Sequence, residues 1–110
     1  IEHFRSPDKV LKKVYSLLQN NGHVFITTPR QDSLKYFIYR SRWNEIQKKF
    51  HLMLFNKKNL KLLLVNSGFR QIEFVNSYEL VPHKNFFRRI VLFVLCKLSL
   101  DGRIVVIAKK

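Results

Sequence analysis

The chain has 110 residues, and its 21 lysines and arginines against 7 aspartates and glutamates give a formal net charge of +14. Hydrophobic residues make up 46% of the chain and aromatic residues 14%, which excludes simple disorder and allows one small domain. The single cysteine, Cys96, excludes an intramolecular disulfide, and the longest apolar run, Ile90 to Cys96, is far shorter than the ~20 residues of a membrane-spanning helix.

The first predicted element is a helix that begins at Ser6 and Pro7. Serine is a preferred N-cap, and proline is tolerated at the first helical position because its missing N–H needs no partner there. Apolar residues then recur on one helical face, at Val10, Leu11, Val14, Leu17 and Leu18. Gly22 can take the left-handed conformation, so we expect the helix to end at residues 20–22.

A strand is predicted directly after this helix, over residues 23–28, and Pro29 closes it. Its β-branched and aromatic residues stand at consecutive positions, as in a strand that is covered on both faces. A helix followed at once by such a strand indicates a βα unit and a parallel sheet.

The middle of the chain predicts two further helices. Asp32 or Ser33 would cap the first, which carries Leu34, Phe37 and Ile38, and residues 43–50 are ambiguous. Asn56 would cap the second, whose apolar face is formed by Leu60, Leu63 and Leu64. Gly68 would end it, with Phe69 packed back on its last turn.

The last third of the chain predicts a strand, a helix and a strand. Residues 71–80 alternate between apolar and polar, which is typical of a strand exposed on one face. Residues 85–100 form a basic, apolar helix, and Asp101 and Gly102 form a turn. Residues 103–108, RIVVIA, form a strong final strand. The order of elements therefore indicates an α/β fold.

Two blocks of residues follow a pattern known from a large enzyme family. The first block consists of Glu2, His3, Phe4, Pro7, Leu17, Leu18, Gly22, Thr28 and Pro29. The second block consists of Trp43, His51, Phe55, Leu60, Leu63, Gly68 and Phe69, and RIVVIAKK follows as a terminal strand. Their order and spacing resemble the C-terminal half of a class I S-adenosylmethionine-dependent methyltransferase, of the small-molecule and lipid-type group.

The resemblance implies the C-terminal half of a Rossmann-like, doubly wound sheet in three αβα layers, a mixed sheet whose last strand is antiparallel. Residues 1–110 would form a partial methyltransferase domain, from the end of the fourth strand to the last strand. The family's glycine-rich loop is absent, because the three glycines at 22, 68 and 102 form no G-x-G pattern. We therefore expect the isolated chain to be inactive, to bind no S-adenosylmethionine, and not to remain a well-behaved monomer.

The resemblance also implies site residues at the crevice beyond the carboxyl ends of the strands. Glu2 and His3 would contact the cofactor, and the alternative is that they orient the loop by hydrogen bonds. Thr28, Pro29 and Trp43 would contact the methyl acceptor, although Thr28 and Pro29 also suit an ordinary strand end. His51 would serve as the base, whereas a packed or surface histidine is the alternative.

A metal is not predicted. In some quinone-type relatives an acid-x-x-Glu-His pattern binds a divalent metal, and Glu2 and His3 match its last two positions. Two ligands are too few for a site.

The acceptor implied by the resemblance is a small or lipid-linked molecule. The helix at 85–100 fits burial or lid packing, which we favour, and it also fits contact with an anionic membrane surface. A nucleic-acid-binding module is the rival interpretation, and it depends on Lys35, Arg40, Arg42, Lys48 and Lys49 among aromatic residues. No recognised nucleic-acid motif is present and the cations are spread along the chain, so this partner is disfavoured. We expect a cytoplasmic location, with membrane association left open.

Overall fold

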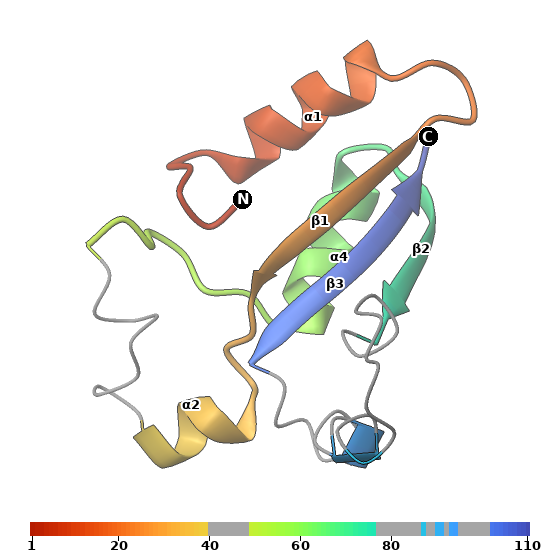
Figure 1. The fold of residues 1–110 in the computed structure, drawn as a ribbon. Coiled ribbons are helices and arrows are strands. Elements are labelled where there is room, and N and C mark those ends of the chain that lie inside the picture. Colours follow the sequence, from red (N-terminus) through yellow and green to blue (C-terminus); the bar gives the residue numbers. More distant parts are fainter. Residues whose placement is uncertain (40–48, 77–86, 88–89, 92, 95–101) are drawn as a thin grey trace.

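The computed structural model describes residues 1–39, 49–76, 87, 90, 91, 93, 94 and 102–110 (Figure 1). In these residues the elements are α1 (Pro7–Leu17), β1 (His23–Pro29), α2 (Leu34–Tyr39), α4 (Lys57–Asn66), β2 (Arg70–Val75) and β3 (Arg103–Lys109). The strands form one sheet in the order β1-β3-β2, and both β1 and β2 pair with β3 in antiparallel fashion. The predicted antiparallel last strand is thus confirmed, and it separates β1 from β2.

In the last third of the chain, two predicted elements differ in length from what the structure describes. The strand predicted over 71–80 covers residues 70–75, with a bulge at its start where Gln71 has a φ of 45°. Residues 77–80 lie outside the described part of the chain. Within the helix predicted over 85–100, the described residues 87, 90, 91, 93 and 94 are helical. The remaining residues of 85–100 lie outside the described part of the chain.

Helix α1 begins as predicted but for a different reason, and it ends earlier. Ser6 is the N-cap residue, yet its side chain makes no capping hydrogen bond, so Pro7 and the acidic Asp8 define this end. The left-handed residue after the helix is Asn21, not Gly22. Gly22 is needed for space instead, because a Cβ there would lie 2.8 Å from the carbonyl oxygen of Gln19.

Leu17, predicted on the buried face of α1, is 71% exposed. It follows the buried Leu11 by six positions, which rotates it about 240° around the helix axis. Val14 and Leu18 follow Leu11 by three and seven positions, and both pack against the core.

Helix α4 begins and ends as predicted. The Asn56 side chain accepts a hydrogen bond of 2.8 Å from the Asn59 N–H, and the Asn59 side chain accepts one of 2.8 Å from the Asn56 N–H. Gly68 has a φ of +102°, and a Cβ there would lie 3.0 Å from the Tyr15 ring of α1. Gly68 therefore ends α4 and also lets it pack closely on α1.

The core lies between the sheet and the two helices α1 and α4. Its buried residues are Leu11, Ile26, Phe55, Leu60, Leu64, Phe69, Ile104, Val106 and Ala108. They come from α1, β1, α4, β3 and the loops at Phe55 and Phe69, and Ile72 and Phe74 of β2 are partly buried against them. The exposed Phe37 and Ile38 of α2 lie outside this cluster. Among the described residues, no helix is long and apolar enough to cross a membrane.

Hydrogen bonds between loops define the end of the sheet where β1 stops. The N–H of Arg30 donates to the Gly102 carbonyl over 2.8 Å, and the N–H of Gln31 donates to the Phe55 carbonyl over 2.8 Å. The N–H of Leu52 donates to the Glu2 carbonyl over 2.9 Å. The N-terminal turn, the end of β1 and the segment 50–55 are therefore held together.

Candidate functional site

Four polar residues from three segments are brought together at the carboxyl end of β1. Glu2 and His3 come from the N-terminal turn, Thr28 from the end of β1, and His51 from the segment that precedes α4. We call these four residues the polar cluster. Thr28 is buried, Glu2 and His51 are half-buried, and His3 is exposed.

Glu2 is anchored to β1. Its Oε2 accepts a hydrogen bond of 3.0 Å from the Thr28 hydroxyl, and the Ile1 amine lies 3.1 Å from the same oxygen. Burial raises the pKa of the Glu2 carboxyl. Hydrogen bonds from the Glu2 backbone, the Ile1 amine and Thr28 together lower this pKa by more than burial raises it, so the net shift is downward. Glu2 therefore carries a negative charge at neutral pH, fixed at the end of the strand.

His3 is oriented by the backbone of a distant segment. Its Nδ1 lies 2.9 Å from the carbonyl oxygen of Phe50, which can only accept, so Nδ1 donates the hydrogen bond. The other ring nitrogen, Nε2, lies 3.7 Å from Oε1 of Glu2. This contact becomes an ion pair when His3 is protonated.

His51 packs edge-on against His3. The ring centroids are 4.8 Å apart, and the ring planes make an angle of 69°. The Glu2 carboxylate and the two imidazoles therefore present their ligand atoms within 4.8 Å of one another.

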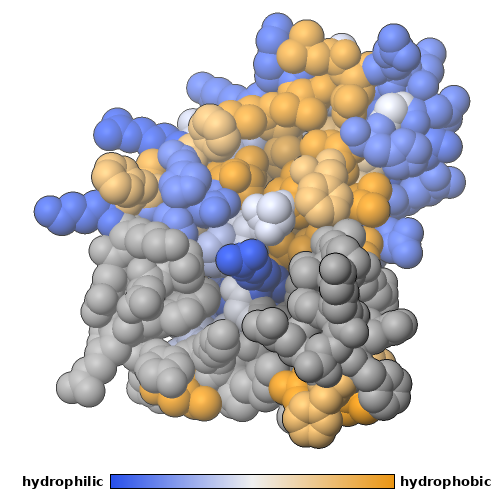
Figure 2. Space-filling model, in the orientation of Figure 1, coloured by the Kyte–Doolittle hydropathy of each residue, from blue (hydrophilic) through white to orange (hydrophobic). Residues whose placement is uncertain are grey.

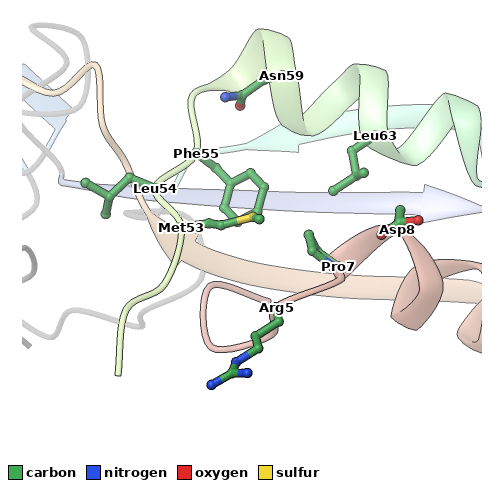
Figure 3. Close-up of a pocket in the computed structure, with 8 residues that line it drawn as sticks. All are labelled: Arg5, Pro7, Asp8, Met53, Leu54, Phe55, Asn59 and Leu63. Carbon is green, nitrogen blue, oxygen red and sulfur yellow. The ribbon is translucent and has the colours of Figure 1, made fainter. Parts of the chain in front are cut away.

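A cleft opens beside the polar cluster, between the starts of α1 and α4 (Figure 3). Its volume is about 430 Å³, and its lining residues are Arg5, Pro7, Asp8, Met53, Leu54, Phe55, Asn59 and Leu63. In this view the Arg5 side chain points away from Met53 and Phe55. Arg5 and Met53 each follow a histidine of the cluster by two positions, so this mostly apolar cleft adjoins the polar groups.

A family model described as a methyltransferase domain matches residues 1–73. The matched span contains α1, β1, α4 and the whole polar cluster, and it is well over half of the chain. The chain belongs to this family of methyltransferase domains.

The fold of the methyltransferase domain also agrees with a solved structure. It is similar to a SAM-dependent methyltransferase from Archaeoglobus fulgidus, with 24% sequence identity and a TM-score of 0.63. The alignment covers 99% of this chain and 55% of that chain, so the domain described here spans about half the length of that protein. The likeness confirms the predicted Rossmann-like fold class. No curated protein matches the sequence.

Four of the six site residues predicted by resemblance meet in the methyltransferase domain. They are Glu2, His3, Thr28 and His51. Pro29 is buried and pairs with Arg103 in the ladder, as a strand end does. Trp43 lies outside the described residues, and so do most of the cations on which the nucleic-acid interpretation depends. The roles of all these residues stay predictions.

The structure adds a third metal-ligating side chain to the two that the sequence pattern offered. Glu2, His3 and His51 each present one ligand atom, and the three atoms lie within 4.8 Å of one another. One carboxylate and two imidazoles fit a divalent transition metal in chemical type, with positions left open for a further ligand. The Phe50 carbonyl, which orients His3 here, is a backbone group that carries no sequence signal.

Proposed function

We propose that this chain supplies the acceptor side of an S-adenosylmethionine-dependent methyltransferase that methylates a small-molecule or lipid-linked acceptor. Membership of the methyltransferase domain family is the first support. The observation that carries the proposal is the polar cluster, which lies at the carboxyl end of β1, where ligands bind in open α/β sheets.

The chemistry asks for positioning and, for some acceptors, for removal of a proton. S-adenosylmethionine, when bound, supplies a methyl group on a positively charged sulfur, which is already activated for transfer. An acceptor hydroxyl must lose its proton as its oxygen takes the methyl group, and an imidazole with a pKa near ~6.5 suits that task. We assign this role to His51, which lies beside the cleft.

Glu2 and His3 would support His51 in this reaction and face the cofactor. The negative charge of Glu2, with a carboxylate oxygen within 4.8 Å of a His51 ring nitrogen, would stabilise the imidazolium that forms when His51 accepts the proton. The apolar cleft lined by Met53, Phe55 and Leu63 suits the hydrophobic part of an acceptor.

The test is a methyl-transfer assay on the chain joined to the sequence that its reading frame encodes upstream. Radiolabelled S-adenosylmethionine is the donor, and a lipid extract and a small-molecule extract are offered separately as acceptors. We expect His51→Ala to lower kcat by about 10²–10⁴-fold and to abolish the acidic limb of the pH–rate profile. His23→Ala is the matched control, because His23 is exposed at the start of β1 and outside the polar cluster.

Three outcomes would contradict the proposal. The upstream frame could lack a strand with a glycine-rich loop, transfer could be absent with both extracts, or His51→Ala could retain the activity of the control. A loss of activity in EDTA that Mn²⁺ restores would assign His51 to a metal instead of to proton transfer.

A further inference from the structure

Two apolar segments, far apart in the sequence, are exposed at one end of the molecule. The first is in α2, where Phe37 and Ile38 are 66% and 64% exposed. The second lies between β2 and β3, where the exposed described residues are Phe87, Ile90, Val91, Phe93 and Val94. We call the two segments together the apolar end.

Both segments lie at the end of the sheet where β1 stops and β3 begins (Figure 1). The hydrogen bond from the Arg30 N–H to the Gly102 carbonyl joins the chain just before α2 to the chain just before β3. Figure 2 shows apolar surface on both sides of this end, remote from α1. The apolar end is therefore separate from the core under α1 and α4, and it adjoins the carboxyl end of β1.

All charged residues within the two sequence stretches that contain the apolar end, 33–44 and 80–100, are basic, and Asp32, Glu45, Glu79 and Asp101 flank these stretches. The sequence has no aspartate or glutamate over residues 33–44 or over residues 80–100. The cations in these two stretches are Lys35, Arg40, Arg42, Lys84, Arg88, Arg89 and Lys97. Exposed aromatic and aliphatic side chains within acid-free basic stretches are the combination that binds an anionic lipid surface.

We propose that the apolar end is a membrane-contact surface that binds anionic bilayers peripherally. Phe37, Ile38 and the exposed described residues of 87–94 enter the interface, and the positive charge of the two stretches attracts the anionic lipid. A second copy of the chain is a poorer occupant, because it would bring two acid-free basic stretches into contact. The proposal does not depend on the proposed function. If both hold, the carboxyl end of β1 faces the membrane, and a lipid-linked acceptor is the favoured class.

The test is vesicle flotation, in which bound protein rises with the lipid and aggregated protein sinks. The full 110-residue chain is mixed with phosphatidylcholine vesicles that contain either no anionic lipid or about 30% phosphatidylglycerol. We expect flotation with the anionic vesicles alone, and at least a tenfold loss of affinity as salt rises from about 50 to 500 mM.

Variants then separate the apolar contribution from the electrostatic one. Phe87→Ser with Val91→Ser leaves the net charge unchanged and is expected to weaken binding at least tenfold. Leu17→Ser with Leu62→Ser is the matched control, because these leucines of α1 and α4 are 71% and 60% exposed elsewhere. The control is expected to bind like the original chain.

Several results would overturn the proposal. They are equal flotation with neutral vesicles, salt-independent flotation, and equal losses in the two double variants. If Phe87→Ser with Val91→Ser abolished self-association in ultracentrifugation but left flotation unchanged, the apolar end would bind a second copy of the chain instead of lipid. If the Phe87 and Val91 variant does not fold by circular dichroism, the lipid and salt dependence of the original chain decides the question.

Discussion

The face of the sheet under α1 and α4 and the end of the sheet at Thr28 are held together by different forces. Under the helices, Leu60, Leu64, Ile104 and Val106 are fully buried, so removal of apolar surface from water dominates. At the end of β1, hydrogen bonds between loops and one half-buried carboxylate dominate. The first region should therefore control stability, and the second should tolerate changes that alter its chemistry.

The largest expected effect is in the core. Leu64→Ala should lower the free energy of unfolding by about 2–5 kcal/mol, because it removes fully buried methyl groups and leaves a cavity. Leu62→Ala is the control on the same helix, since Leu62 is 60% exposed, and it should change stability by less than about 0.5 kcal/mol. Urea denaturation measures both, and similar midpoints would contradict the comparison.

Gly68→Ala comes next. Alanine is strained at a φ of +102°, and its Cβ would meet the Tyr15 ring at 3.0 Å, so we expect a loss of about 1–3 kcal/mol. In a Tyr15→Ala background the steric part disappears and about 1 kcal/mol for the left-handed backbone remains. Thermal unfolding of the original chain, the two single variants and the double variant separates the two parts. If Gly68→Ala cost as much in the Tyr15→Ala background as in the original chain, the ring contact would be ruled out.

Removal of the N-cap side chain should affect stability differently in α1 and α4, although serine and asparagine both commonly cap helices. Asn56→Ala should cost about 1 kcal/mol, because it removes the side-chain oxygen that accepts the hydrogen bond from the Asn59 N–H. Ser6→Ala should cost close to nothing, because the Ser6 side chain makes no capping hydrogen bond. Denaturation midpoints check the difference, and equal losses would show that Ser6 does cap α1.

The smallest effect is at the polar cluster and depends on pH. The pKa of Glu2 is lowered on folding, so Glu2 stabilises the fold above the ordinary carboxyl pKa of ~4.3, and this contribution is lost as the pH falls through the lowered value. Glu2→Gln should thus reduce stability slightly at neutral pH, and this loss should shrink as the pH falls below the lowered pKa of Glu2. Glu73→Gln, on the exposed face of β2, is the control. A pH-independent loss would contradict the assignment.

Much of the fold could be predicted because the signals are local. Asn56 and Gly68 define the ends of α4 within a few residues of sequence, and both predictions are confirmed. Local signals also led to errors of detail. The left-handed residue after α1 is Asn21 instead of Gly22, because the glycine is needed for space.

The candidate site was less accessible to sequence reasoning, because it depends on contacts between distant segments. Glu2 and His3 are adjacent in sequence, but the carbonyl that orients His3 belongs to Phe50, 47 residues later. Spacing alone does not reveal that His51 then completes a set of three ligating side chains. Only the loop hydrogen bonds at the end of β1 bring these segments together.

The order of the strands has a consequence for how the chain is made. The strand in the middle of the sheet, β3, is the last to be synthesised, and β1 and β2 pair with it and not with each other. Until β3 emerges, the edges of β1 and β2 that pair with it carry unsatisfied backbone groups, and such edges invite pairing with other chains. Strands β1 and β2 therefore become joined only after residues 103–109 have been synthesised.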